Sequence, residues 1–190
     1  MLSQFSAEGE HATLANLNYL FPKDVYPVGR LDSDSEGLLI LTNDSRLNNM
    51  LLNPSFAHER SYLVQVDGTF TIEAKEQLKK GTTININGKM YNTLPAKVEI
   101  LNEEPEVCDR NPPVRFRKNI PTSWIRISLI EVKNRQVRRM TASVGFPTLR
   151  LIRVSICKLK LEGMQAGEVR SIAQNDLFKL LHLEIPRNNK

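Results

Sequence analysis

The sequence predicts an α+β fold in one domain that spans residues 1–190. Alternating polar and apolar residues predict two long strands in the middle and late parts of the chain. Apolar residues at helical spacing, together with capping and stop signals, predict five helices placed singly between extended segments. These segments do not follow the strict alternation of strand and helix that a parallel sheet requires, so the α+β class is favoured.

The first part of the chain begins with a short amphipathic helix predicted over 13–20, from leucines at helical spacing. An extended stretch at 26–28 leads into a polar turn at 29–36. The apolar run 38–41 predicts a buried strand, because a glycine and an Asn-Asp turn bound it. A helix is expected over 45–52, since Ser45 can cap its start and Asn-Pro ends it.

The middle of the chain begins with a strand over 60–67, in which polar and apolar residues alternate. A helix follows over 71–80, with a threonine cap at its start and a glycine at its end. An Asn-Gly turn predicts a hairpin over 83–91. After another strand at 96–101, the proline-rich segment 102–121 is expected to be a loop.

The last part of the chain opens with a strand over 123–132, in which Trp124 is expected in the core. A helix over 134–144 should be capped by Asn134. A strand follows at 149–156. Shorter extended pieces and a final helix are expected at 158–161, 169–172 and 175–183.

The composition is that of a folded soluble protein, with 41% hydrophobic and 25% charged residues. No apolar run approaches the ~20 residues of a membrane span. The N-terminus lacks the basic and apolar regions of a signal peptide, so the cytoplasm is the expected location. Cys108 and Cys157 lack metal-ligand spacing and are expected to be reduced and partly buried.

The formal net charge is +5, and the positive charges are unevenly distributed. Between Lys133 and Arg153 there are six basic residues and no Asp or Glu. A second basic cluster precedes them and consists of Arg110, Arg115, Arg117 and Lys118. This segregation predicts one basic face, as a nucleic-acid site requires, although an ordinary solvated surface is an equal alternative.

The polar turn at 29–36 carries three carboxylates, Asp32, Asp34 and Glu36. Two of them could form an acid-base pair, as in glycosidases, or together they could bind a divalent cation. Asp34 and Ser35 are assigned to closing the turn. Asp32 stands two residues from Arg30 and leads into the buried run, so it is the candidate catalytic acid.

Arginines also open the helix predicted over 134–144, where Arg135, Arg138 and Arg139 could offer guanidinium groups to phosphates. An arginine facing inward there would need a carboxylate partner. The alternative is a solvated helix face. Tyr62 is either a core residue with a polar tip or an aromatic platform for a nucleobase.

Several enzyme classes are disfavoured because their motifs are absent. The sequence has no phosphate loop, dinucleotide fingerprint or nucleophile elbow. Its histidines are scattered and form no metal-binding pattern. Kinases, dehydrogenases, serine hydrolases and zinc deaminases are therefore disfavoured.

Three segments of the chain, in the same order, resemble the motifs of one family, the pseudouridine synthases of the small-subunit synthase A type. The catalytic motif corresponds to Gly29–Asp32 followed by Ser35–Asn43, and the middle motif to Arg60–Val64, with a basic residue two before a tyrosine. The last motif block corresponds to Asn134–Met140, Val144–Pro147 and Leu149–Arg153. The resemblance covers about residues 1–172.

This resemblance implies a mixed, largely antiparallel sheet in two lobes, with flanking helices and a central RNA-binding cleft. The runs Arg110–Pro113 and Ile120–Trp124 resemble a subgroup that acts on the large ribosomal subunit. The implied activity is isomerisation of one uridine in large-subunit rRNA to pseudouridine, without cofactor or metal. A monomer with no membrane partner is expected.

The resemblance also implies roles for individual residues. Asp32 would be the catalytic carboxylate, which either attacks the substrate or removes a sugar proton to give a glycal; the sequence leaves both routes open. Arg138 would pair with Asp32 and keep it ionised, and Tyr62 would stack on the target base. Arg30 would enter the RNA stack in place of the flipped nucleotide. The RNA-binding residues would be Arg30, Arg60, Lys133, Arg135, Arg139, Arg150 and Arg153.

The chain also departs from the family pattern. Related chains begin with a strand carrying Lys-Pro that is not found here, so a truncated N-terminus and no separate RNA-binding domain are expected. Val132 stands where the family more often has glycine, and the tail after Ile172 has no counterpart. Two other functions stay open: a non-catalytic RNA-binding or ribosome-assembly factor, and a metal-dependent nuclease using Asp32, Asp34 and Glu36.

Overall fold

The fold is centred on a six-stranded sheet, described by a computed structural model over residues 1–114 and 121–183. Five strands follow the order β10-β9-β4-β8-β7. Strand β2 lies outside this order and also pairs with β9. Only the pairing of β2 with β9 is parallel, which confirms the expected mixed, largely antiparallel sheet. The strands are β2 (Glu36–Gly37), β4 (Arg60–Asp67), β7 (Lys97–Ile100), β8 (Thr122–Leu129), β9 (Thr148–Ile156) and β10 (Leu159–Lys160).

Smaller elements surround this sheet. Two pairs of strands form separate antiparallel ribbons, β1 (Tyr26–Pro27) with β3 (Leu41–Thr42) and β5 (Thr83–Ile86) with β6 (Lys89–Asn92). The helices are α1 (Ser45–Leu52), α2 (Ile72–Lys80), α3 (Gln136–Ser143) and α4 (Gln174–Leu180), with short 3-10 turns η1 (Leu14–Asn16) and η2 (Pro54–Phe56). None of the helices in the described ranges is long and apolar enough to cross a bilayer.

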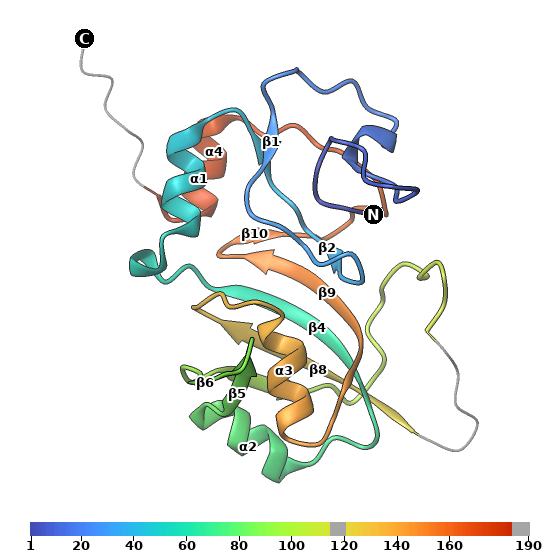
Figure 1. Ribbon diagram of the computed structural model, residues 1–190, viewed down its shortest axis with the longest axis vertical. Coiled ribbons are helices and arrows are strands. Elements are labelled where there is room, and N and C mark those ends of the chain that lie inside the picture. Colours follow the sequence, from blue (N-terminus) through green and yellow to red (C-terminus); the bar gives the residue numbers. More distant parts are fainter. Residues whose placement is uncertain (115–120, 184–190) are drawn as a thin grey trace.

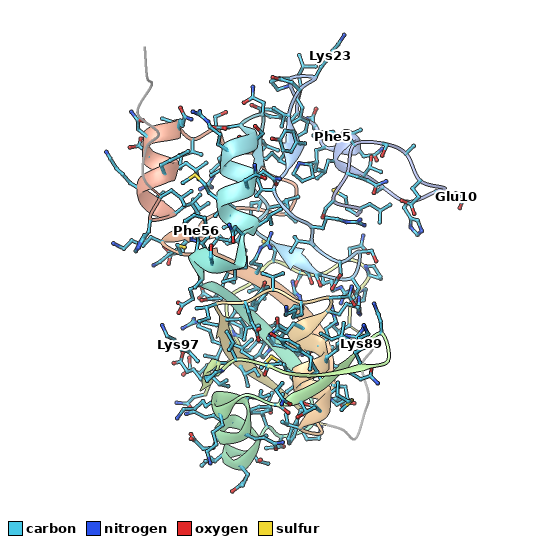
Figure 2. All side chains as sticks on the ribbon, turned by 60° about the vertical axis from the view of Figure 1, so that its left-hand side comes forward. Phe5, Glu10, Lys23, Phe56, Lys89 and Lys97 are labelled. Carbon is cyan, nitrogen blue, oxygen red and sulfur yellow. The ribbon has the colours of Figure 1, made fainter. Side chains whose placement is uncertain are left out.

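Figure 1 shows β4 and β9 running across the middle of the molecule. Helices α1 and α4 and the N-terminal segment lie on one side of these strands, and α2 and α3 lie on the other. The two groups of helices give the molecule two lobes, as the sequence predicted. Charged side chains such as Lys23, Lys89 and Lys97 project from its outer edges (Figure 2).

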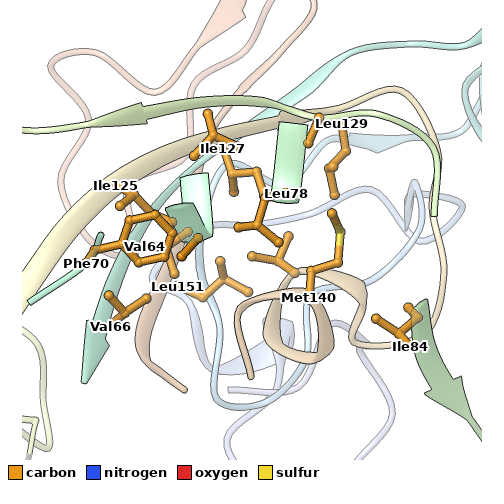
Figure 3. Packing of buried hydrophobic residues seen from close by; sticks show 14 residues of the cluster. Val64, Val66, Phe70, Leu78, Ile84, Ile125, Ile127, Leu129, Met140 and Leu151 are labelled. Carbon is orange, nitrogen blue, oxygen red and sulfur yellow. The ribbon is translucent and has the colours of Figure 1, made fainter. Parts of the chain in front are cut away.

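The larger core fills the lobe of α2 and α3 (Figure 3). Val64 and Val66 of β4 meet Ile125 and Ile127 of β8, and all four are fully buried. Met140 packs onto them from α3. Each such side chain contributes about 1.5–3 kcal/mol through burial, so this core fixes β4 and α3 relative to each other.

A second core fills the other lobe. Leu47 and Leu51 of α1 and Phe178 and Leu181 of α4 are all buried there, together with Ile156 at the end of β9. Strand β9 therefore contributes to both cores. The segment where the two cores meet is the part of the sheet that carries the candidate site.

Several predicted elements are confirmed in detail. The strand over 60–67 is β4, and α2 has Thr71 as its N-terminal cap and Gly81 at its end. The Oγ1 atom of Thr71 accepts a hydrogen bond from the N–H of Ala74 at 3.2 Å. The hairpin of β5 and β6 turns at Asn87 and Gly88, both of which have positive φ angles, 52° and 85°.

Three predictions about the first part of the chain were wrong. The helix over 13–20 is only the turn η1, since Leu20 is 95% exposed and has no apolar surface to cover. The strand over 38–41 is not formed, because β2 ends before it and only Leu41 belongs to β3, although Leu38 and Ile40 are buried as expected. The helix over 45–52 is confirmed as α1, but its cap is Asp44 and not Ser45.

Corrections of the same kind apply further along the chain. Helix α3 begins at Gln136. The residue at its N-terminal cap position is Arg135, in the left-handed conformation (φ 50°, ψ 35°), and not Asn134 as predicted. The stretch 169–172 forms no strand, and β8 ends at Leu129, short of 132. Trp124 is buried as expected. Both cysteines are free; Cys157 is half-buried, whereas Cys108 is exposed and not partly buried.

Candidate active site

The polar turn that carries Asp32 is anchored at both ends. Before Asp32, the buried Ser3 side chain forms two hydrogen bonds with the backbone of Leu31. It accepts one from the N–H at 3.0 Å and donates one to the carbonyl at 3.2 Å. After Asp32, the N–H of Ser35 closes a tight turn onto the Asp32 carbonyl at 2.9 Å. Glu36 then enters β2, beside Ile152 of β9. Asp32 is therefore held by the central sheet.

A cavity of about 380 Å³ lies beside this turn, between the two lobes. Its walls come from the turn, from α1, from β4 and β9, and from the segment 129–137. The cavity brings together seven of the predicted site residues: Arg30, Asp32, Arg60, Tyr62, Lys133, Arg135 and Arg153. Residues more than 120 positions apart in the sequence thus share one pocket, which is lined by five basic and three acidic residues.

Asp32 faces Arg135 across this cavity. The Nη1 atom of Arg135 lies 3.5 Å from the Oδ2 atom of Asp32, and about a third of the Asp32 side chain is exposed. At this distance the two groups form an ion pair, yet no side chain or backbone group of residues 1–114 and 121–183 is seen to hydrogen-bond the carboxylate. Asp32 is therefore partly accessible from the cavity, as a carboxylate that acts on a substrate must be.

The expected ion pair between Arg138 and Asp32 is not formed. The Nη2 atom of Arg138 instead donates to the Asp34 carbonyl at 2.8 Å and lies 3.4 Å from the Asp34 carboxylate. Its Nη1 atom donates to the carbonyl of Thr148 at 3.4 Å. Burial lowers the pKa of Arg138, and the charge of Asp34 opposes that effect. Arg138 therefore joins α3, β9 and the turn, and holds Asp32 only indirectly.

Asp34 does more than the turn closure assigned to it. Both of its carboxylate oxygens accept hydrogen bonds from Arg135, at 3.0 and 2.8 Å. This bonding lowers the pKa of Asp34 below its usual value, with a smaller contribution from the charge of Arg138. Asp34 is thus the ionised group around which Arg135, just before α3, and Arg138, within it, are arranged.

Glu36 is directed away from the other two carboxylates. It accepts two hydrogen bonds from Arg150, at 2.9 and 2.8 Å, and lies 3.7 Å from Arg110. Across residues 1–114 and 121–183, no three His, Cys, Asp or Glu side chains gather as a metal site would need. The arrangement of the three acids therefore gives no support to the nuclease alternative.

Tyr62, Arg60 and Arg153 lie on one face of the sheet. Arg60 is two residues before Tyr62 on β4, and Arg153 stands opposite Tyr62 on β9. Arg60 and Arg153 are only 7% and 6% exposed. Both were expected to bind RNA at a basic face, but their burial places them at the inner end of the cavity and not on the outer surface.

The other predicted RNA-binding residues have varied positions. Arg30 and Lys133 are exposed at the cavity, and the Nζ atom of Lys133 lies 4.7 Å from the centre of the Tyr91 ring. Arg139 bonds to Asn134 and to the carbonyl of Asn85, outside the cavity. Arg150 is buried and donates hydrogen bonds to Glu36 and to the carbonyl of Cys108.

Of the second basic cluster, only Arg110 is described, and it lies against Glu36 and the carbonyl of Leu149. Arg115, Arg117 and Lys118 lie outside the described residues.

The sequence did not reveal two supports of the site. Ser3 anchors the turn from the N-terminal segment, where no helix or strand was predicted, and no local pattern distinguishes it from other serines. Glu131 accepts hydrogen bonds from Tyr91, Leu94 and Gln136 and so fixes the start of α3. An isolated acid next to a basic segment was the signal available for Glu131.

Comparison with known proteins places this geometry in a family. The family model for RNA pseudouridylate synthase matches residues 4–143. A ribosomal large subunit pseudouridine synthase E of Vibrio parahaemolyticus is 50% identical over 171 residues, which cover 90% of this chain and 69% of that protein. One of Xanthomonas axonopodis is 43% identical over 86% of this chain and 84% of that protein. The chain belongs to the RNA pseudouridylate synthase family.

A solved structure supports the same assignment. The crystal structure of a pseudouridylate synthase superposes with a TM-score of 0.67 at 27% identity. The match covers 83% of this chain, and the chain spans 60% of that one. The family resemblance seen in the sequence motifs, and the fold that it implied, are both confirmed.

Proposed function

We propose that this protein isomerises a uridine of large-subunit ribosomal RNA to pseudouridine, with Asp32 as the catalytic carboxylate. The observation that carries the proposal is the shared cavity, in which Asp32 and Tyr62 lie among five basic side chains. The relatives named as large-subunit synthases support the choice of RNA.

The reaction requires the target nucleotide to leave its stack and enter the cavity. Flipping costs a few kcal/mol, which contacts in the pocket must offset. The 380 Å³ cavity has room for a base, and Tyr62 offers an aromatic surface to it. Arg30, exposed at the cavity beside Asp32, is positioned to enter the space that the nucleotide leaves in the RNA.

Asp32 then acts at the sugar. The C1′–N1 bond breaks, and both of its electrons remain with the base. The Asp32 carboxylate either bonds to C1′ or takes the proton from C2′. Carbon 5 of the base then bonds to C1′, either as the Asp32–C1′ bond breaks or as Asp32 returns its proton to C2′. Carbon 5 finally loses its proton and N1 gains one, so the ring recovers its conjugation. Arg135 holds Asp32 toward the cavity, and Arg138 positions the turn from behind.

RNA binding is assigned to the exposed cations. Arg30, Lys133 and Arg135 are exposed at the cavity, where phosphates can reach them. Their contribution should be electrostatic and sensitive to salt. The protein is proposed to act as a monomer in the cytoplasm.

The proposal is tested by mapping pseudouridine in rRNA from cells with the gene, without it, and with the gene for Asp32→Asn. We expect one large-subunit position to be modified only in the first. If the same map is found in all three, the proposed function is wrong. A binding factor without catalytic activity would give that result while still associating with the ribosomal RNA.

A further inference from the structure

Two buried arginines at the inner end of the cavity have no role in the chemistry described so far. Arg60 and Arg153 lie on the same face of the sheet as Tyr62, from adjacent strands β4 and β9. Burial lowers the pKa of both, and the charge of Arg60 lowers the pKa of Arg153 further.

These two positive charges have no negative partner. Among the described residues, no Asp or Glu oxygen lies within 4 Å of either guanidinium, although Arg135, Arg138 and Arg150 each have such a partner. Two like charges that are buried together without a counter-charge are unfavourable. Beside a cavity, these two charges stabilise a negatively charged group that enters it.

Part of the hydrogen-bonding capacity of these side chains is not used within the protein, although Arg153 also interacts with the Tyr62 side chain. A guanidinium has five N–H donors. Arg60 uses its two terminal nitrogens on the carbonyls of His58 and Leu51, at 2.8 and 2.7 Å. Arg153 uses its Nε atom on the carbonyl of Leu38 at 2.8 Å. Its Nη2 atom is buried and has no hydrogen-bond partner, and Arg153 lines the cavity.

We propose that Arg60 and Arg153 form a subsite for the pyrimidine base as an anion, binding its carbonyl oxygens. The inference rests on the proposed function. When the C1′–N1 bond breaks, the electron pair that leaves with N1 spreads through the ring onto the carbonyl oxygens. Fixed cations at those oxygens favour the departing base over the neutral bound base, so they lower the barrier to bond breaking.

The alternative ligand, a backbone phosphate, fits this position less well. Phosphate contacts belong at the exposed rim, where Arg30 and Lys133 lie. Arg60 and Arg153 are instead more than nine-tenths buried, on the strands that carry Tyr62. A group that reaches them must enter the cavity fully, which a flipped base does and a bridging phosphate does not.

The test is the affinity of the full-length protein for two free bases at neutral pH, measured by calorimetry. One is uracil, which is neutral, and the other is 5-nitrouracil, whose electron-withdrawing group makes the ring an anion under these conditions. We expect the anion to bind about tenfold more tightly or better, because charge-assisted hydrogen bonds replace neutral ones. Arg153→Met and Arg60→Met should remove this preference, and Arg153→Lys should keep part of it.

Arg126→Met serves as the matched control, since Arg126 is an exposed arginine of β8 paired with Glu99. It should leave the preference unchanged. Equal affinities for the two bases in the unaltered protein would overturn the subsite, and so would an undiminished preference in Arg153→Met. The comparison in the unaltered protein decides the matter even if a methionine variant does not fold.

Activity separates this subsite from the proposed function. If the protein prefers the anion through Arg153 but isomerises no RNA, the proposed function is wrong and the anion site stands. If Arg153→Met isomerises RNA at the full rate, the subsite is wrong and the proposed function stands.

Discussion

Arg135 binds both carboxylate oxygens of Asp34, at 3.0 and 2.8 Å, across 101 positions of sequence. The same side chain lies 3.5 Å from Asp32. This one arginine therefore couples the start of α3 to the turn that carries the candidate catalytic acid. Its backbone takes the left-handed conformation, which costs free energy in a residue other than glycine and is maintained by these contacts.

The ion pair of Asp34 should make stability depend on pH. Its pKa is lowered in the folded state, so its contribution is present above the unfolded value near 3.8 and is lost as the pH falls further. Asp34→Asn should therefore destabilise the protein at neutral pH, by roughly 1 kcal/mol given its partial exposure. In urea unfolding the difference from the unaltered protein should shrink progressively as the pH falls below 3.8.

Glu99→Gln provides the comparison, since Glu99 forms an exposed pair with Arg126. It should change stability by less than about 0.5 kcal/mol at neutral pH. A difference between Asp34→Asn and the unaltered protein that stays constant down to acid pH would show that the loss does not come from the charge of Asp34.

Arg138 should be needed for rate more than for RNA affinity. Its Nη2 atom fixes the Asp34 carbonyl, so its removal lets the turn and Asp32 move. Arg138→Met should slow single-turnover isomerisation about 100-fold or more, because small displacements of a reacting group are costly. Arg138→Lys keeps the charge but not the planar fork, and should recover only part of the rate. RNA affinity within about twofold of the unaltered protein is expected for both variants.

Gly37 lies where β2 meets β9 and cannot accept a side chain. A Cβ atom there would come 2.3 Å from the carbonyl oxygen of Arg153, and φ is +105°. Gly37→Ala should cost about 2–4 kcal/mol of unfolding free energy and displace the turn. Gly88→Ala is the matched control, with φ +85° and nothing within 4 Å. It should cost about 1 kcal/mol from backbone strain alone. Equal losses in the two variants would show that the contact with β9 is unimportant.

Lys133 should act on RNA binding through charge. It is exposed at the cavity and makes no ion pair among the described residues. Lys133→Met should weaken binding of any RNA and reduce the slope of log affinity against log salt by about 0.7–0.9, the value for one phosphate contact. An unchanged slope in filter-binding titrations would remove Lys133 from the interface.

Local patterns in the sequence were sufficient for most of the sheet and for the presence of all four α-helices, although not for every helix end. Strand β4, helix α2 and the hairpin at Asn87 and Gly88 follow from alternation, capping and turn chemistry, which depend on near neighbours. The helix over 13–20 failed because helical spacing alone cannot show whether a partner surface exists. The position of β2 at 36–37, ahead of the strand predicted over 38–41, depends on pairing with distant β9, which no local pattern records.

The candidate site was likewise predicted in part, since its residues follow from local motifs but their pairing depends on distant contacts. The motifs predicted Asp32, Tyr62 and five basic residues, and the cavity gathers them. They did not predict which arginine meets which acid, because that choice depends on how α3 lies against the turn. Arg138 therefore reached Asp34 and not Asp32, and Arg60 and Arg153 proved to be buried.

Single-turnover isomerisation of large-subunit rRNA by Asp32→Asn, with RNA affinity measured on the same sample, is the most direct test of this account. The amide keeps the size of the side chain and removes its charge. We predict no detectable pseudouridine, with RNA affinity close to that of the unaltered protein. Pseudouridine formed at the normal rate by Asp32→Asn would contradict the account.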